Sequence, residues 1–162
     1  MDARDMIRDY DPAQHRDQVK SCVVELQEFE RALEPSLPRG KDMADAYLTF
    51  LLDWCSKAAG RVLVAEVDRR VVGFVAVFAR VAPEEPDEDQ TPYAYISDLV
   101  VLPRYRRRGI GRALLEHAEA LVGRSGARIL RVGVLAKNEP AAKLYRAAGF
   151  SDYQLHLVKR LP

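Results

Sequence analysis

Apolar residues in the first sixty positions recur at intervals of three and four, which is the period of an α-helix. One stripe begins after Pro12, a residue that suits the first turn of a helix. A second follows the prolines and glycine of residues 35–40. The stripes are Val19, Cys22, Val23, Leu26, Phe29 and Leu33, then Met43, Ala46, Tyr47, Phe50, Leu51 and Trp54. We expect a short strand at residues 5–10, followed by two helices, the second of which ends near Gly60.

The pattern changes after Gly60 to runs rich in β-branched and aromatic residues, which favour strands. Asp68, Arg69 and Arg70 separate the first two runs and suit a hairpin turn. An acidic loop with prolines at residues 82–92 precedes the third run. The predicted strands are residues 61–67, 71–81 and 93–102.

The last third of the chain alternates helical and strand patterns. A helical stripe begins near Ile110, and glycines end it before residue 127. A shorter helix begins after Asn138, a residue that caps helices, and stops at Gly149. Strands are predicted at residues 129–136 and 153–159. Because the connections are short, we predict one α/β (α+β) domain over residues 1–162.

The composition is typical of a globular domain. The chain has 162 residues, 48% of them hydrophobic, and 25 Lys plus Arg against 24 Asp plus Glu, a formal net charge of +1. Disorder would need lower hydrophobicity or a larger net charge. The longest run of apolar residues and glycine, residues 71–79, is nine residues long, whereas a membrane-spanning helix needs about 20. We therefore expect no membrane partner.

The N-terminus and the cysteines indicate a cytoplasmic protein. The first five residues carry acids and no apolar stretch, so no signal peptide is visible. Cys22 and Cys55 are too few for a disulfide framework or a zinc site. We interpret them as small buried thiols in a reducing compartment, and we expect no metal.

The near-zero net charge conceals two windows of opposite sign. Residues 82–92 hold five acids and no base, whereas residues 104–112 hold five arginines and no acid. The basic window contains the segment Arg106-Arg107-Arg108-Gly109-Ile110-Gly111-Arg112, which joins a predicted strand to a predicted helix. The basic window therefore lies at the predicted start of a helix, where backbone amides have no hydrogen-bond acceptor within the helix.

This junction has the features of a phosphate site. The first turn of a helix presents unpaired amides and a positive dipole end. Glycines allow close approach to the backbone, and arginines bind phosphate. The pattern indicates either a phosphate or pyrophosphate ligand or a solvated basic turn. It fits neither a Walker loop nor a dinucleotide fingerprint, because no Lys-Ser/Thr follows and Leu114 occupies the third glycine position.

A second block, Asn138 to Phe150, follows the next predicted strand. Together the two blocks resemble the GNAT superfamily of N-acetyltransferases. Arg106, Gly109 and Gly111 match the acetyl-coenzyme A loop, Arg/Gln-x-x-Gly-x-Gly/Ala. The second block is similar to Asn-x-x-Ala-x-x-x-Tyr-x-x-x-Gly-Phe, matched at Asn138, Ala141, Tyr145, Gly149 and Phe150. The resemblance covers residues 95–150.

The resemblance implies a central twisted sheet, mixed but mostly antiparallel, with six to seven strands and about four flanking helices. Two parallel strands, here residues 95–102 and 129–136, would splay apart to form a cleft for acetyl-CoA. Splaying usually needs a bulge, which frees backbone amides. The implied cofactor-binding residues are Leu99, Val100, Val101, Arg106, Arg107, Arg108, Gly109, Ile110, Gly111, Arg112, Asn138 and Tyr145.

The implied reaction is transfer of an acetyl group from acetyl-CoA to a primary amine by direct attack in a ternary complex. Tyr145 would protonate the departing thiolate, and backbone groups of Leu99, Val100 and Val101 would polarise the thioester carbonyl. The general base is Asp98, one of Tyr93, Tyr95 and His156, or a chain of waters, which members of the family often use. Asp98 is otherwise an acid that faces solvent or a helix. Asn138 either caps its helix or orients the cofactor.

The acceptor and the partners are less constrained. The acidic loop at residues 84–89 either favours a cationic acceptor, such as a small amine, polyamine, aminoglycoside-like or peptide amine, or has no role. Members of the family are often homodimers, and residues 153–159 offer an edge strand for this. One alternative is a non-catalytic acyl-CoA sensor. Another is nucleic-acid binding through the arginines, which the net charge argues against.

Overall fold

Two helices account for most of the first sixty residues, which confirms the prediction. The structure, a computed structural model, describes residues 2–162. Helix α1 (Pro12–Leu33) starts where the Asp11 carboxylate accepts a hydrogen bond from the Ala13 amide at 2.9 Å. Helix α2 (Gly40–Lys57) follows a short connection. A 3₁₀ turn (Ala3–Met6) and strand β1 (Ile7–Asp9) precede both helices.

The buried side of α2 differs from the predicted stripe. Its buried residues are Gly40, Ala44, Leu48, Leu51 and Cys55. Phe50, by contrast, is 54% exposed and Trp54 is 37% exposed. Apolar side chains cover most of the circumference of α2, so the period of the sequence alone does not select the face that packs.

One mixed sheet, with strand order β1-β2-β3-β4-β5, forms the centre of the described residues. The pairings from β1 to β4 are antiparallel, and β4 pairs with β5 in parallel. This confirms a mixed, mostly antiparallel sheet, but the expected six to seven strands are wrong, because residues 2–162 contain five. The remaining strands are β2 (Arg61–Val67), β3 (Arg70–Val81), β4 (Tyr93–Val101) and β5 (Leu130–Val132).

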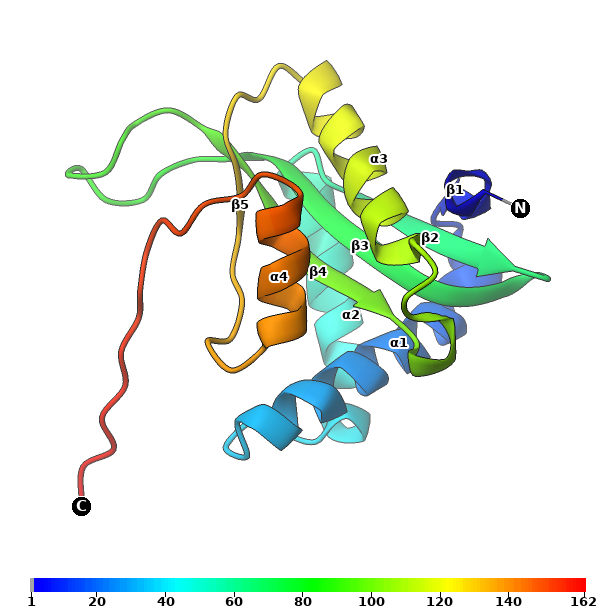
Figure 1. Ribbon diagram of the computed structural model, residues 1–162. Helices are drawn as coiled ribbons and strands as arrows, with labels where there is room; N and C mark the ends of the chain where they lie inside the picture. Colours follow the sequence, from blue (N-terminus) through cyan, green and yellow to red (C-terminus); the bar gives the residue numbers. More distant parts are fainter. Residues whose placement is uncertain (1) are drawn as a thin grey trace.

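Helices cover both faces of the sheet (Figure 1). Helices α1 and α2 lie on one face, and α3 (Ile110–Arg124) and α4 (Glu139–Ala147) lie on the other. Each face has its own cluster of buried side chains. Strand β3 is buried from Val71 to Ala79 and contributes to both clusters, as expected for a central strand covered on both sides.

Strands β4 and β5 are paired only over a short distance. The parallel register joins Ala94–Ile96 to Leu130–Val132, whereas β4 continues to Val101. The predicted strand at 129–136 is therefore shorter in the structure. At the point of separation, a side chain at Gly133 would place its Cβ 2.9 Å from the Tyr95 hydroxyl. Glycine there allows Tyr95 to lie against the backbone, and no pairing with β4 follows it.

The predicted strand at residues 153–159 is wrong for the single chain. Residues 151–162 form neither helix nor strand, and all twelve are exposed. Figure 1 shows this segment running away from α4 toward the C-terminus. Tyr153 contacts Arg131 of β5 through its side chain, but within residues 2–162 no strand forms backbone hydrogen bonds with the segment, and a strand needs such a partner.

Candidate active site

A β-bulge in β4 decides where Asp98 points. Ile96 pairs with Val77 and Asp98 pairs with Ala76, so Ser97 is an extra residue without a partner on β3. Before the bulge, Ile96 packs in the cluster beneath α3; after it, Val100 packs in the cluster beneath α1 and α2. The inserted residue reverses the alternation of faces. Asp98 therefore faces α1 and α2 from the centre of the sheet.

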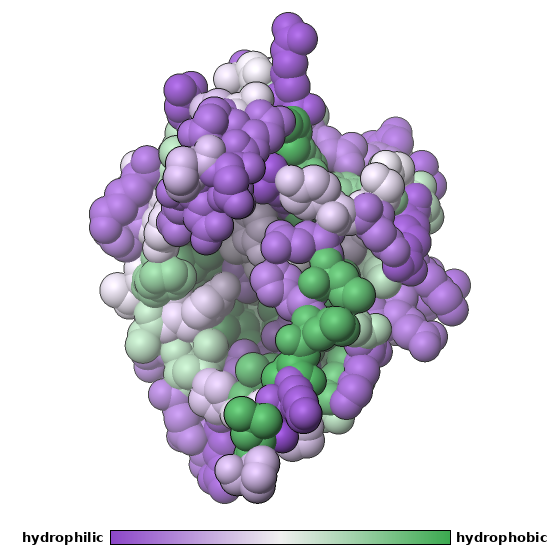
Figure 2. All heavy atoms as spheres, turned by 90° about the vertical axis from the view of Figure 1, so that its left-hand side faces the viewer, coloured by the Kyte–Doolittle hydropathy of each residue, from purple (hydrophilic) through white to green (hydrophobic). Residues whose placement is uncertain are grey.

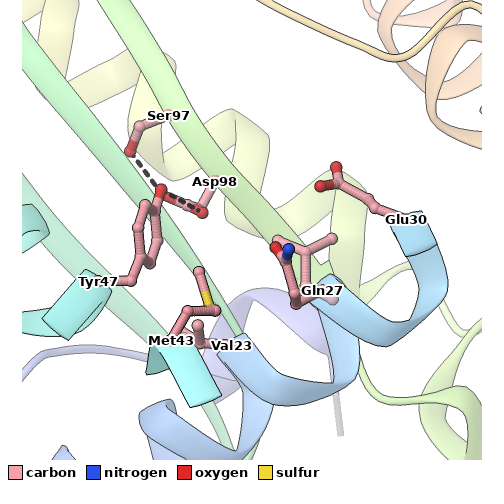
Figure 3. A pocket seen from close by; sticks show the side chains of 8 residues that line it. Val23, Gln27, Glu30, Met43, Tyr47, Ser97 and Asp98 are labelled. Atoms are coloured by element: carbon pink, nitrogen blue, oxygen red, sulfur yellow. Dashed lines mark hydrogen bonds between the residues drawn. The ribbon is translucent and has the colours of Figure 1, made fainter. Parts of the chain in front are cut away.

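A small cavity opens at this point between α1, α2 and β4 (Figure 3). Its volume is about 170 Å³. Helix α1 contributes four positions spaced as one helix face, α2 contributes two that are four apart, and β4 contributes the bulge. The lining residues are Val23, Leu26, Gln27, Glu30, Met43, Tyr47, Ser97 and Asp98. Three of them are apolar, and the two that carry charge are both acids.

Asp98 is the most buried acid of the cavity and accepts hydrogen bonds from two hydroxyl groups. The Tyr47 hydroxyl donates to its two carboxylate oxygens at 2.9 and 3.0 Å, and the Ser97 hydroxyl donates at 2.8 Å. Figure 3 shows these groups gathered at one end of the cavity. Burial raises the pKa of Asp98, and the two hydroxyl donors oppose that shift. A proton acceptor with a raised pKa lies closer to neutral pH than a free carboxylate does.

Tyr145 lies within electrostatic reach of Asp98 from the other side of the sheet. It is buried on α4, whose first turn is held by the Asn138 side chain accepting from the Ala141 amide at 3.2 Å. The Tyr145 ring meets Phe150 edge to face at 5.6 Å. Burial, followed by the charge of Asp98, raises the pKa of Tyr145. The phenol is therefore a proton donor throughout the physiological range. The capping function of Asn138 is confirmed.

The edge of β4 beyond the bulge has free backbone groups. The Leu102 amide donates to Val72 of β3 at 2.8 Å, so alternation directs the amides of Leu99 and Val101 to the opposite edge. Strand β5 has already separated there. The Val101 carbonyl on this edge accepts a hydrogen bond from Arg106 Nε at 2.8 Å. Val100, by the same alternation, points its amide toward β3.

The start of α3 presents amides without helical acceptors. Gly109 precedes the helix with a φ of 80°, a left-handed conformation that favours glycine. The first helical bond is from the Ala113 amide to the Gly109 carbonyl, so the amides of Ile110, Gly111 and Arg112 have no acceptor within the helix. The Ile110 side chain is buried in the core. Its role at this turn is therefore limited to its backbone.

The arginines of this loop point in different directions. Arg106 turns toward α1, where it lies over the Phe29 ring at 5.3 Å and 3.9 Å from Glu25. This differs from the expectation that its side chain belongs to the phosphate turn. Arg107 has a left-handed φ of 62°. Arg108 and Arg112 line an open depression of about 520 Å³ beside Gly109, together with Arg4.

Carboxylates already pair with part of this charge. Glu116 lies 3.0 Å from both Arg4 and Arg112. Both arginines remain mostly exposed, at 64% and 75%, and such surface pairs are weak. A phosphate at this turn would therefore compete with Glu116 for exposed guanidinium groups, with Arg108 as a further donor.

Sequence reasoning missed Glu30 and Tyr47. Tyr47 belongs to an apolar stripe of α2, and its hydroxyl becomes significant only when the bulge turns Asp98 toward it. Glu30 lies seven positions after Val23, so the helical period places both on one face of α1. A polar residue on a predicted core face was the available signal. Neither cavity is lined by any residue of the acidic loop at 82–92.

Other features of the described residues bear on the chemistry. Both cysteines are buried and free, and burial raises the pKa of Cys22 to about 12 and that of Cys55 to about 11. Residues 2–162 contain no group of three or more His, Cys, Asp or Glu residues arranged to hold a metal ion. No helix in that range is long and apolar enough to cross a membrane.

Comparison with known proteins identifies the family. The model of the acetyltransferase (GNAT) family matches residues 26–150, which is most of the chain. The chain therefore belongs to the acetyltransferase (GNAT) family. The sequence is similar to L-2,4-diaminobutyric acid acetyltransferase from Nocardia farcinica, with 33% identity over 94 residues, 58% of this chain and 45% of that protein. It is also similar to an N-alpha-acetyltransferase from Sulfurisphaera tokodaii, with 30% identity over 111 residues, 65% of each.

Solved structures share the fold over nearly the whole chain. A putative acetyl transferase from Pyrococcus furiosus has a TM-score of 0.73 at 22% identity, covering 96% of this chain and 99% of that one. Aminoglycoside N-acetyltransferase AAC(6')-Iy in complex with CoA has a TM-score of 0.67 at 17% identity, covering 96% and 98%. This chain spans less than half the length of the first curated relatives that it matches.

Proposed function

We propose that the protein is an N-acetyltransferase that moves an acetyl group from acetyl-CoA to a primary amine by direct attack in a ternary complex. The Ser97 bulge carries this proposal, because it sets the Asp98 carboxylate on one side of β4 beside amides freed at its edge. Family membership supports it, as do the N-acetyltransferase activities named for the relatives. Tyr145, whose pKa is raised, supplies the proton donor that the reaction requires.

The backbone supports a fit to acetyl-CoA in two places. The free amides of Ile110, Gly111 and Arg112 suit its pyrophosphate, with Arg107, Arg108 and Arg112 nearby. The open edge at Leu99 and Val101 suits its pantetheine arm, which carries amide groups of its own. The backbone contact that the resemblance implies for Val100 is not part of the proposal, because its amide is directed toward β3. Arg106 holds the Val101 carbonyl, and Asn138 positions α4.

The chemical step needs an acceptor and a donor of protons on opposite sides of the reacting carbon. Starting from the neutral amine, the nitrogen forms a bond to the thioester carbon and gives a proton to Asp98. An edge amide of β4 stabilises the charge on the carbonyl oxygen. As the carbon–sulfur bond breaks, the Tyr145 hydroxyl gives its proton to sulfur. Solvent then returns the proton held by Asp98 to Tyr145, which restores both groups.

The proposal is tested by release of free thiol from acetyl-CoA in the presence of a panel of primary amines. Amine-dependent release, with the acetylated amine identified by mass spectrometry, is the expected result. Binding of CoA without release on any amine would instead favour an acyl-CoA sensor. Binding of DNA that weakens steeply with salt would favour the arginine run as a nucleic-acid site, although Arg106 and Arg112 already contact glutamates.

Replacing Gly109 by alanine is expected to raise the KM for acetyl-CoA and to lower the free energy of unfolding by about 1–2 kcal/mol. The reason is that an L-residue resists the left-handed φ of 80°. Gly126, at the end of α3, has a φ of 84° and is the matched control. Gly126→Ala should cost similar stability in thermal unfolding and leave the KM unchanged. Equal KM values in both variants would contradict a role for the Gly109 turn in cofactor binding.

We also propose that two copies pair through residues 151–162. The segment is extended and exposed, with Leu157 at 87% exposure, and Figure 2 shows strongly hydrophobic side chains gathered beside a hollow on this face. Antiparallel pairing about His156 would set Leu155 opposite Leu157. Asp152 and Arg160 would also face each other, although within the chain they pair with Arg146 and Glu34. Such pairing matches apolar with apolar side chains, and it gives the two-fold symmetry common in homodimers.

Sedimentation is expected to show a dimer for the unaltered protein and a monomer for Leu157→Asp. The aspartate would place two carboxylates in the paired apolar face. Gln154→Asp, which adds the same charge on the other face of the segment, is the control and should remain dimeric. The segment is exposed, so neither change should alter thermal unfolding of the monomer. A monomeric unaltered protein at high concentration would contradict the pairing.

We propose the cytoplasm as the site of action. The observation in support is that Cys22 and Cys55 are both buried and free, as expected for a protein folded in a reducing compartment.

A further inference from the structure

Several glutamates lie in the second half of α1 or directly after it, and one of them differs from the rest. Glu28 pairs with Arg31, Glu34 with Arg160, and Glu25 lies 3.9 Å from Arg106. Glu30 has no Lys, Arg or His partner within residues 2–162, although it is half-buried on the cavity face. A charge in such a place normally has a partner, because removing it from water is costly.

Asp98 is the second acid that lines the cavity, and its charge makes the missing positive partner of Glu30 more costly. Burial raises the pKa of Glu30, and the charge of Asp98 raises it further. Within the described chain no Lys, Arg or His lines the cavity, so nothing there offsets the two carboxylates. Figure 3 shows Glu30 and Asp98 approaching the cavity from different elements, α1 and β4. A cation bound between them would relieve the repulsion.

The remaining residues of the cavity indicate which part of a ligand would lie between Glu30 and Asp98. Val23, Leu26 and Met43 give the cavity apolar walls, which suit methylene groups. The volume of about 170 Å³ is close to that of an engineered cavity of about 150 Å³ that holds benzene. It therefore accepts about six non-hydrogen atoms. A four-carbon chain with a nitrogen at each end has this size.

We infer that Glu30 binds a second cationic group of the acceptor, so that the cavity selects short aliphatic diamines, or larger molecules that end in one. This inference rests on the proposed acetyl transfer. One nitrogen lies at Asp98 and is acetylated, while the other remains an ammonium group held by Glu30. The apolar walls contact the carbons between them. Glu30 is a specificity-determining residue in this arrangement, and Asp98 acts on the reacting nitrogen.

The test compares 1,4-diaminobutane with pentylamine, which has the same number of heavy atoms but a methyl group in place of the second ammonium. The unaltered protein should show a kcat/KM for the diamine at least about tenfold above that for pentylamine, as a hydrogen bond between charged groups provides. Glu30→Gln should reduce this ratio to near one by lowering the value for the diamine alone. Glu28→Gln, two residues away on the same helix, should keep the original ratio.

The outcomes separate this inference from the proposed function. Thiol release with equal kcat/KM for the two amines, or an equal loss for both in Glu30→Gln, overturns the role of Glu30 and leaves acetyl transfer in place. If neither amine releases thiol, thermal unfolding with CoA present decides the point. Stabilisation by the diamine but not by pentylamine, lost in Glu30→Gln, supports the site. Equal shifts with the two amines overturn it.

Discussion

Replacing Asp98 by asparagine is expected to lower kcat/KM by about two to three orders of magnitude. The change removes the group that accepts the proton of the attacking amine, a role worth that much in general base catalysis. It keeps the size of the side chain and an oxygen for the Tyr47 hydroxyl. Thiol release at varied amine concentrations, measured across pH, is the assay. The acidic limb of the kcat/KM profile has two sources, protonation of Asp98 and protonation of the amine. The variant should lose the first and keep the second.

The same substitution should maintain or increase stability, which separates a functional carboxylate from a structural one. The pKa of Asp98 is raised in the folded protein, so its contribution to stability is greatest below the unfolded pKa and is lost as pH rises through the folded pKa. Asparagine has no ionisable group, so the variant does not lose stability at this position as the pH rises. The difference in free energy of unfolding, variant minus unaltered protein, should therefore grow with pH. An inactive variant that also unfolds easily at neutral pH would indicate a structural role.

Tyr145→Phe is expected to lower kcat by about a hundredfold, with little change in the KM for acetyl-CoA. The phenol would protonate the departing sulfur, and a thiol with a pKa of about 8.5 is a tolerable leaving group, so the loss falls at the lower end for a general acid. The ring keeps its edge-to-face contact with Phe150. Steady-state kinetics with a saturating amine measures the effect.

Two controls accompany this variant. Tyr153→Phe removes a hydroxyl from an exposed tyrosine of the C-terminal segment and should leave kcat unchanged. The pKa of Tyr145 is raised by burial and by Asp98, so the unaltered protein should keep its kcat up to about pH 10. A kcat for Tyr145→Phe within twofold of the unaltered value would mean that solvent protonates the sulfur.

The sequence predicted the order of elements well, because each has a local signal. Pro12 and Asn138 mark helix starts, and glycines mark helix ends. The two motif blocks located the turn before α3 and the helix of Tyr145. The predicted contributions of these residues to cofactor binding and catalysis stay predictions until the variants are measured.

The remaining features depend on contacts between distant residues. The face of Asp98 depends on a bulge at Ser97, which only pairing with β3 reveals. Arg106 turns to Phe29 and Glu25 because α1 lies there. The segment 153–159 alternates like a strand, but a strand also requires a neighbour, and the pattern does not say which chain supplies it. Glu30 and Tyr47 gain their significance from the cavity that two helices and one strand enclose.

The three-residue pairing between β4 and β5 has a consequence for motion. It is the one parallel pairing in the described sheet and is among the shortest, yet α4 and Tyr145 follow directly from β5. A unit secured by so few backbone bonds can open locally while β2, β3 and β4 stay folded. In hydrogen exchange, the amides of residues 130–132 should therefore lose protection before those of β3. A ligand that bridges the two splayed strands would slow that opening and so couple cofactor occupancy to the placement of the proton donor.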